Sequence, residues 1–177
     1  GIAVIEGLRG AQVGAAVKHY PGLGAVSGNT DFTTEGILDM TTTLDGAEAG
    51  AFDQAITKTD PAMAMMSLAT YQAIDPNNPA VFSSTIIDGH IRNALKYTGV
   101  VISDSISAEA LSSYDVSQLG VKLVEAGGDM SCIGQTDYVK PIVDGLNERA
   151  KSDPAFASKV TAAATRVMTL KIKMGLA

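Results

Sequence analysis

Four short apolar segments, separated by longer stretches with helical spacing, constrain the fold of this chain more than any other feature. Each is only five or six residues long, and none alternates regularly between apolar and polar residues. Such segments are typical of strands that are buried on both faces of a parallel sheet. The four segments are Val13–Val17, Ala62–Ser67, Gly99–Ser103 and Asp129–Ile133.

Helical patterns lie between and after these segments, over residues 45–57, 84–95, 108–126, 138–150 and 155–174. Asp153 followed by Pro154 is typical of a helix start, and Gly175 of a helix end. The alternation of strands and helices predicts an α/β fold with a parallel sheet, which is either an open sheet or half of an eight-stranded (β/α) barrel. The first residues resemble a helix that is already under way, so we expect further residues before Gly1.

The composition argues against several classes of function. The 177 residues carry a net charge of −6 and no basic run, which argues against nucleic acid and anionic membranes as partners. No apolar run approaches the roughly 20 residues of a transmembrane helix. The single cysteine, Cys132, excludes an internal disulfide. The sequence contains no metal-ligand cluster, no phosphate-binding glycine loop and no nucleophile elbow, so we expect no cofactor.

Polar residues gather where the predicted strands end: Lys18 and His19, residues 67–71, Asp104, and Asp129 onward. Parallel sheets place their sites at the carboxyl ends of strands. Asp104 either projects into such a site or caps the next helix. Lys18 and His19 can bind sugar hydroxyls or an anion, and the alternative is a solvated lysine beside a packed histidine. Two carboxylates at one barrel mouth are the minimum for glycoside hydrolysis, and Asp104 is a plausible half of such a pair.

Several segments match one set of motifs in chain order. KHYPGLG (18–24) resembles K-H-F-P-G-H-G, GVVISDS (99–105) resembles V-I-S-D-D, and AGGDMSCI (126–133) resembles an A-G-x-D-M strand. These are motifs of the bacterial β-N-acetylglucosaminidases of glycoside hydrolase family 3. Two longer segments are similar to actinobacterial members in particular, at residues 69–87 and 152–177.

The resemblance implies a TIM-type (β/α)8 barrel, of which residues 1–177 supply roughly the carboxyl-terminal half with about four strands. We expect the amino-terminal half elsewhere, for example on a separate chain. The implied reaction is removal of terminal β-linked N-acetylglucosamine from cell-wall or chitin-type oligosaccharides by retaining double displacement. The resemblance makes Asp104 the nucleophile and Lys18 and His19 substrate-binding residues. It also implies a secreted or envelope protein, and a cytoplasmic location is the alternative.

The loop after KHYPGLG departs from the family, in which D-S/T-H supplies an Asp–His dyad for acid/base catalysis. An ungapped alignment places Asn29, Thr30 and Asp31 at these positions, and a shifted one places Thr33 where the histidine belongs. Because neither supplies an imidazole, the simplest hypothesis makes Asp31 the acid/base, with a raised pKa. The alternatives are a β-glucosidase or phosphorylase of this family, and a sugar-binding relative without catalysis.

Overall fold

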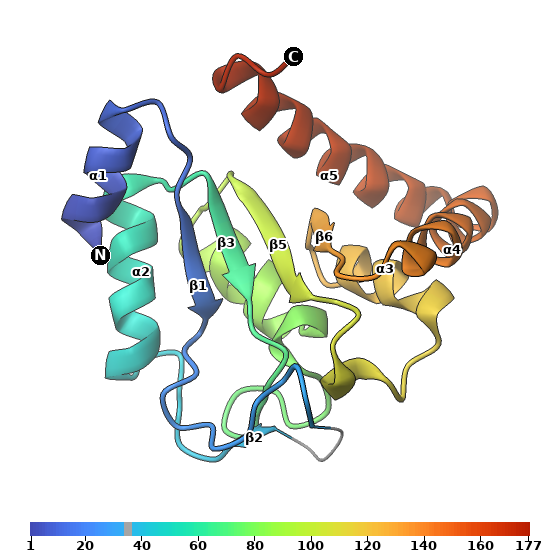
Figure 1. Ribbon diagram of the computed structural model, residues 1–177, viewed down its shortest axis with the longest axis horizontal. Helices are drawn as coiled ribbons and strands as arrows, with labels where there is room; N and C mark the ends of the chain where they lie inside the picture. The colour runs from blue at the N-terminus through green and yellow to red at the C-terminus, as the bar shows by residue number, and fades with distance from the viewer. Residues whose placement is uncertain (34–36) are drawn as a thin grey trace.

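Four parallel strands form the main sheet, in the order β1-β3-β5-β6 (Figure 1). This spatial order equals the chain order, whereas the doubly wound folds reverse their strand order at a switch point. Successive neighbouring strands are the arrangement of an arc of a (β/α) barrel. The computed structural model describes residues 1–33 and 37–177. The strands are β1 (Ala16–Tyr20), β3 (Met63–Met66), β5 (Val100–Ser105) and β6 (Met130–Cys132).

Three strands lie on the predicted segments, but β1 begins three residues later than the predicted start at Val13. Its pairing with β3 sets its extent, because Ala16 lies opposite Met63 and Tyr20 lies opposite Met66. Lys18 and His19 therefore lie inside β1 and do not follow it. They lie between the paired residues Val17 and Tyr20, where the register with β3 is irregular.

Most helices also follow the predicted ranges. They are α1 (Ile2–Gly10), α2 (Ala47–Thr59), η2 (Thr85–Ala94), α3 (Val116–Glu125), α4 (Val139–Ser152) and α5 (Pro154–Lys173). The prediction of one helix over 108–126 is wrong, because the Asp115 side chain accepts from the Ser117 amide and starts α3. The predicted cap of α5 is confirmed, since the Asp153 side chain accepts from the amides of Ala155 and Phe156.

Shorter elements were not expected from the sequence. Two two-residue strands, β2 (Leu38–Asp39) and β4 (Thr70–Tyr71), pair in parallel beside the main sheet. Three single turns of 3₁₀ helix are η1 (Ala80–Phe82), η3 (Glu109–Leu111) and η4 (Thr136–Tyr138). Segments of two or three residues are too short to show a periodic pattern, so only tertiary contacts define them.

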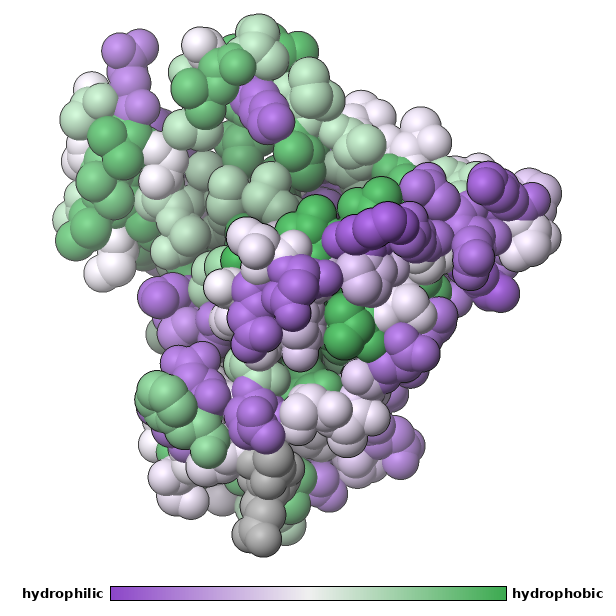
Figure 2. Space-filling view, turned by 45° about the vertical axis from the view of Figure 1, so that its right-hand side comes forward, coloured by the Kyte–Doolittle hydropathy of each residue, from purple (hydrophilic) through white to green (hydrophobic). Residues whose placement is uncertain are grey.

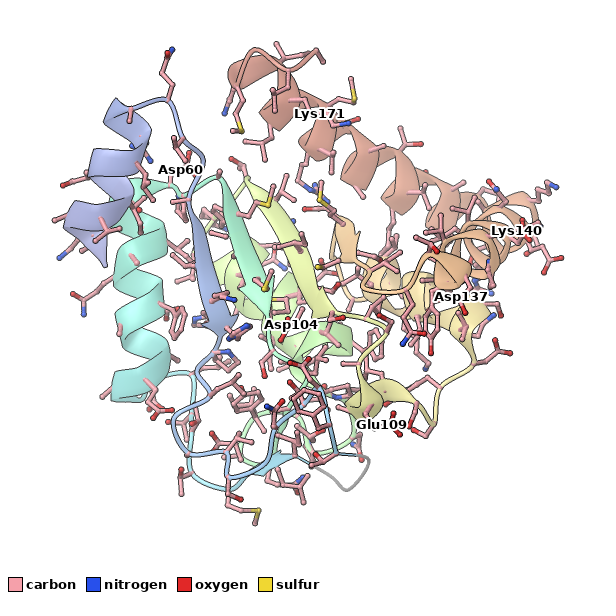
Figure 3. The ribbon with its side chains drawn as sticks, viewed as in Figure 1. Asp60, Asp104, Glu109, Asp137, Lys140 and Lys171 are labelled. Carbon is pink, nitrogen blue, oxygen red and sulfur yellow. The ribbon has the colours of Figure 1, made fainter. Side chains whose placement is uncertain are left out.

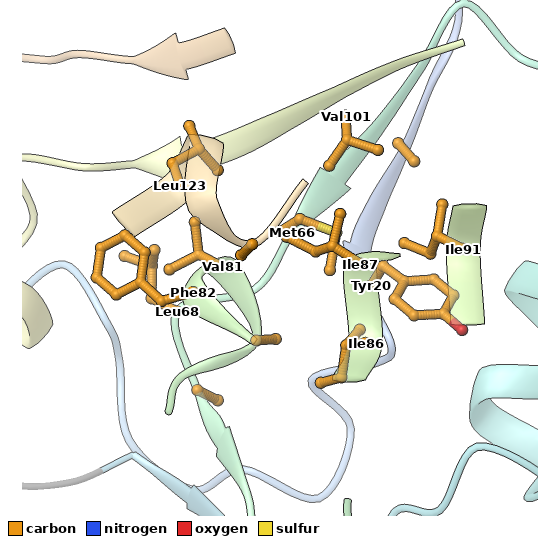
Figure 4. Close-up of a cluster of buried hydrophobic side chains, with 14 of the residues drawn as sticks. Tyr20, Met66, Leu68, Val81, Phe82, Ile86, Ile87, Ile91, Val101 and Leu123 are labelled. Atoms are coloured by element: carbon orange, nitrogen blue, oxygen red, sulfur yellow. The ribbon is translucent and has the colours of Figure 1, made fainter. Parts of the chain in front are cut away.

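The core lies on the helix-facing side of the sheet. Met66, Ile87, Ile91 and Val101 are fully buried there (Figure 4). The burial of each such side chain contributes about 1.5–3 kcal/mol. The other face differs, because Ala64 and Met66 of β3 are buried while Met63 and Met65 are half-buried. The prediction that β3 is buried on both faces is therefore wrong for the described residues, since helices cover only one face.

Exposed apolar side chains gather near the amino ends of the strands, on α1 and α5. Val4 and Leu8 belong to α1, and Met168 and Ile172 belong to α5. The upper part of Figure 2 shows hydrophobic surface at this end of the molecule, with more hydrophilic surface below. Among residues 1–33 and 37–177, no helix has the length and apolar character needed to cross a bilayer.

Candidate active site

The carboxyl ends of the strands open into a pocket of about 390 Å³. Figure 3 shows Asp104 at this end of the sheet, with Asp60 and Lys171 at the opposite end. The structure brings all four predicted site residues into this one pocket, from β1, from β5 and from the segment after β1. The lining residues are Lys18, His19, Leu23, Val26, Gly28, Asn29, Thr30, Asp31 and Asp104.

The side chains of His19 and Asp104 are in contact in the pocket. The distance from His19 Nε2 to Asp104 Oδ2 is 3.4 Å, and the two side chains are 23% and 19% exposed. The residues come from β1 and β5, which β3 separates. Each lies where the register of its strand pair is irregular, between Val17 and Tyr20 and between Ile102 and Ser105. Such irregularities redirect side chains and are frequent beside active sites.

Backbone contacts fix the orientation of Asp104. Its Oδ1 accepts from the Ser105 amide at 2.8 Å, so Oδ2 is the oxygen that faces His19. The preceding residue, Ser103, is fully buried, and its hydroxyl accepts from the Cys132 amide of β6 at 2.9 Å. A hydrogen bond to β6 therefore holds the end of β5, and this fixes the backbone position of Asp104.

Burial lowers the pKa of His19 below its ordinary value of 6.5. The carboxylate of Asp104 raises this pKa, Lys18 lowers it, and Asp31 raises it, but the two carboxylates do not outweigh burial. His19 is therefore neutral at pH 7. A neutral imidazole carries one donor and one acceptor nitrogen, which suits a pair of sugar hydroxyls.

Asp31 lies on a turn that Asn29 organises. The Asn29 side-chain oxygen accepts from the Asp31 amide at 2.9 Å, and its carbonyl accepts from the amides of Phe32 and Thr33. Thr30 is buried, and its carbonyl accepts from the Ala110 amide of η3 at 3.1 Å. Asp31 is exposed at the pocket edge. Sequence reasoning predicts neither of these structural roles, although Asn is a typical turn-forming residue and is the local signal for the Asn29 turn.

A larger cavity of about 880 Å³ lies at the other end of the strands. Arg9, Asp60 and Lys173 contribute to its lining, whereas the four predicted site residues do not. Because parallel sheets place their sites at carboxyl ends, the smaller pocket is the candidate active site. The expectation that Asp129 belongs to the strand-end polar group is wrong, because Asp129 precedes β6.

The chain matches the glycosyl hydrolase family 3 N terminal domain over residues 1–170. It belongs to glycoside hydrolase family 3. The crystal structure of a beta-N-acetylhexosaminidase from Beutenbergia cavernae is similar, with a TM-score of 0.88 and 36% identity. That similarity covers 96% of this chain and 50% of the other. It confirms the predicted TIM-type (β/α) fold.

Two further proteins are similar in sequence. A beta-hexosaminidase from Nitrosomonas eutropha is 30% identical over 132 residues, which are 74% of this chain and 37% of that protein. An uncharacterized secreted glycosyl hydrolase from Arthroderma benhamiae is 34% identical over 123 residues, which are 66% of this chain and 33% of that protein. The chain thus spans between a third and a half of the length of these relatives.

Proposed function

We propose that the pocket at the ends of β1 and β5 takes part in hydrolysis of terminal β-linked N-acetylglucosaminides with retention of configuration. The observation that carries this proposal is the convergence of Lys18, His19, Asp31 and Asp104 in one pocket. The relatives named beta-hexosaminidase and beta-N-acetylhexosaminidase support the choice of sugar. The natural substrates proposed are cell-wall or chitin-type oligosaccharides.

Asp104 is the proposed nucleophile. Its ionised Oδ2 attacks the anomeric carbon and forms a glycosyl–enzyme ester, while the bond from that carbon to the leaving oxygen breaks. The Ser105 amide holds Oδ1, which keeps the carboxylate in one orientation. Neutral His19 and the Lys18 ammonium bind hydroxyls of the sugar that is transferred, which places its anomeric carbon beside Asp104.

Asp31 is the proposed general acid and base. In the first step its protonated carboxyl gives a proton to the leaving oxygen. In the second step the resulting carboxylate takes a proton from water, which attacks the ester and releases the sugar. The contacts made by Asn29 and Thr30 support this role, because they hold the turn at the edge of the pocket.

We also propose that the chain forms the carboxyl-terminal half of the barrel, and that the remaining strands complete the site. Two features of the described residues support this. Within 1–33 and 37–177, β1 pairs only with β3 and β6 pairs only with β5, so the sheet has two open edges. The half-buried Met63 and Met65 lie on the face that a closed barrel fills with side chains.

A location outside the cytoplasm is proposed as well. The relative from Arthroderma benhamiae that is named a secreted glycosyl hydrolase supports it. Fractionation of the source cells with an antibody to this chain tests the location. We expect the antigen in the envelope or the medium, and recovery in the cytosol alone would contradict the proposal.

Substitution of Asp104 by Asn tests the proposed reaction. We expect turnover of an aryl N-acetyl-β-glucosaminide to fall on the order of a thousand-fold or more, because an amide cannot form the glycosyl ester. The thermal midpoint should change little, since Asn keeps the size of the side chain. Asp144→Asn, at an exposed position of α4, is the matched control. Substantial turnover by Asp104→Asn would remove Asp104 from the nucleophile role.

A further inference from the structure

The segment between β1 and β2 supplies most of the pocket wall. Residues 23–31 of this segment contribute Leu23, Val26, Gly28, Asn29, Thr30 and Asp31 to the lining. The position of Asp31 therefore depends on how the two ends of the segment are attached to the barrel. Both attachments are made to residues 70–72, in and next to β4, and the first is made by Tyr71.

Tyr71 holds the start of the segment with its side chain. The fully buried Tyr71 donates its hydroxyl hydrogen to the Gly22 carbonyl oxygen at 2.6 Å. The Gly22 amide in turn donates to the His19 carbonyl at 2.8 Å. Gly22 thus connects Tyr71 with a residue of the pocket. Its φ of +131° is accessible to glycine, and a Cβ there would lie 3.1 Å from Oε2 of Glu48.

The two neighbours of Tyr71 hold the far end of the segment, through the backbone pairing of β4 with β2. Asp39 of β2 lies opposite Tyr71, and the Asp39 carbonyl accepts from the Gln72 amide at 2.9 Å. The Thr70 amide donates to the Ile37 carbonyl at the same distance. The Tyr71 hydroxyl therefore attaches the start of the segment, and the backbone of Thr70 and Gln72 attaches its far end.

The main sheet fixes Tyr71 itself. Only residues 67–69 separate the end of β3 from β4. Ser67 is fully buried, its amide donates to the Tyr20 carbonyl at 2.9 Å, and its hydroxyl accepts from the Ala69 amide at 3.0 Å. The connection between β3 and Tyr71 is thus hydrogen-bonded to the end of β1, and Tyr71 occupies a fixed position relative to His19.

We propose that Tyr71 is a positioning residue, whose hydroxyl acts through Gly22 to hold the segment that carries Asp31 at the edge of the pocket. This inference rests on the proposed function, because it assigns Tyr71 to the segment that carries the general acid. Tyr71 is fully buried and does not line the pocket, so its effect on the reaction is indirect. Its loss should therefore affect proton transfer to the leaving group more than binding of the sugar.

Tyr71→Phe tests the proposal, with Tyr97→Phe as a matched control. Tyr97 is also buried, and its hydroxyl donates to the Pro61 carbonyl at 2.8 Å, before β3 and away from the pocket. Each substitution removes one buried hydroxyl that donates to a backbone carbonyl. Three quantities are measured in the intact protein: the thermal midpoint, hydrogen exchange of the amides of residues 22–33, and kcat/KM on N-acetylglucosaminides with poor and with activated leaving groups.

We expect Tyr71→Phe to lower kcat/KM about ten-fold on the poor leaving group and at most about two-fold on the activated one. Exchange of the amides at 22–33 should accelerate in Tyr71→Phe and stay unchanged in Tyr97→Phe, although both variants lose similar thermal stability. Equal kinetics and equal exchange in the two variants would overturn the positioning role. A wild-type protein without turnover would contradict the proposed function, and the exchange data would still decide whether Tyr71 holds the segment.

Discussion

His19 lies among two carboxylates and an ammonium group, so its titration reports on the charges of the pocket. Burial lowers its pKa below 6.5, Asp104 raises it and Lys18 lowers it. We expect Asp104→Asn to lower the pKa of His19 further and Lys18→Met to raise it. An NMR titration of the imidazole Cε1–H signals measures both shifts, and His19→Gln assigns the signal, because the sequence contains only two histidines. An unchanged pKa of His19 in both variants would show that Asp104 and Lys18 do not influence its titration.

The same lowered pKa predicts how His19 affects stability. Above pH 6.5 the imidazole is neutral in the folded and the unfolded state, so its contribution is constant. Below pH 6.5 the unfolded state binds the proton more readily, and the folded state loses stability until the pH passes the folded-state pKa. We therefore expect the free energy of unfolding, measured with urea at several pH values, to fall less below pH 6.5 in His19→Gln than in wild type. An equal loss would contradict the lowered pKa.

Substitution of Asp31 tests whether this residue is the general acid or only a loop residue without a role in catalysis. We expect Asp31→Ala to reduce kcat/KM by about 10²–10⁴-fold on substrates with poor leaving groups and far less on activated aryl glycosides, which need no proton. Equal losses on both substrates would argue against the acid role.

Product analysis in phosphate buffer distinguishes hydrolysis from phosphorolysis. A sugar phosphate would identify phosphorolysis, and water incorporation would identify hydrolysis.

Residue type and position were enough to predict part of the pocket. Lys18, His19 and Asp104 are polar residues at the ends of apolar segments, so local sequence indicated these three, whereas Asp31 was chosen only through the resemblance to the family's loop. The role of Tyr71 gave no such signal. Its hydroxyl binds a carbonyl 49 residues earlier in the chain, and a contact of this kind exists only after the two segments pack together.

Asp129 connects several elements and is a stability residue. Its carboxylate is fully buried and pairs with Arg92 of η2 and with Arg166 of α5, the latter at 2.8 Å. It also accepts from the Val101 amide of β5 at 2.8 Å. We expect Asp129→Asn to lower the free energy of unfolding by about 3 kcal/mol, because two arginines lose their buried counter-charge.

Urea denaturation measures this change, and Asp144→Asn is again the control. Asp144 is 55% exposed and pairs with Lys140 one turn away on α4, so its loss should change the free energy of unfolding by at most about 0.5 kcal/mol. Similar changes in the two variants would show that the buried cluster contributes no more than a surface pair.

At the scale of elements, the sequence was most informative where one local cause decides the structure. The cap at Asp153 and the apolar segments of β3 and β5 follow from residue type and spacing, and they were predicted. The split of the predicted 108–126 helix at Asp115 was missed, although aspartate is a good cap, because the apolar spacing continues through it. The pair of β2 and β4 was also missed, since backbone contacts between distant segments form it.

For the whole molecule, the inner face of the sheet makes the half-barrel proposal testable. Met65 of β3 is half-buried and lies on the face opposite Met66, which belongs to the core. If the remaining strands close the barrel over this face, a charge at position 65 becomes buried without a partner, which is costly. In the described residues alone, the same charge still reaches water. Met65→Lys should therefore disrupt assembly of the full barrel and leave the stability of residues 1–177 nearly unchanged.

We expect Met65→Lys to abolish activity and stable association with the other half of the barrel, measured by native mass spectrometry of the active protein. The thermal midpoint of residues 1–177 expressed alone should change little. Met168→Lys on α5, where the native side chain is 45% exposed, is the control and should leave assembly and activity intact. Two open sheet edges also predict that residues 1–177 alone self-associate and are inactive. A folded and active monomer of these residues would contradict the half-barrel proposal, because its inner face would then need no second half.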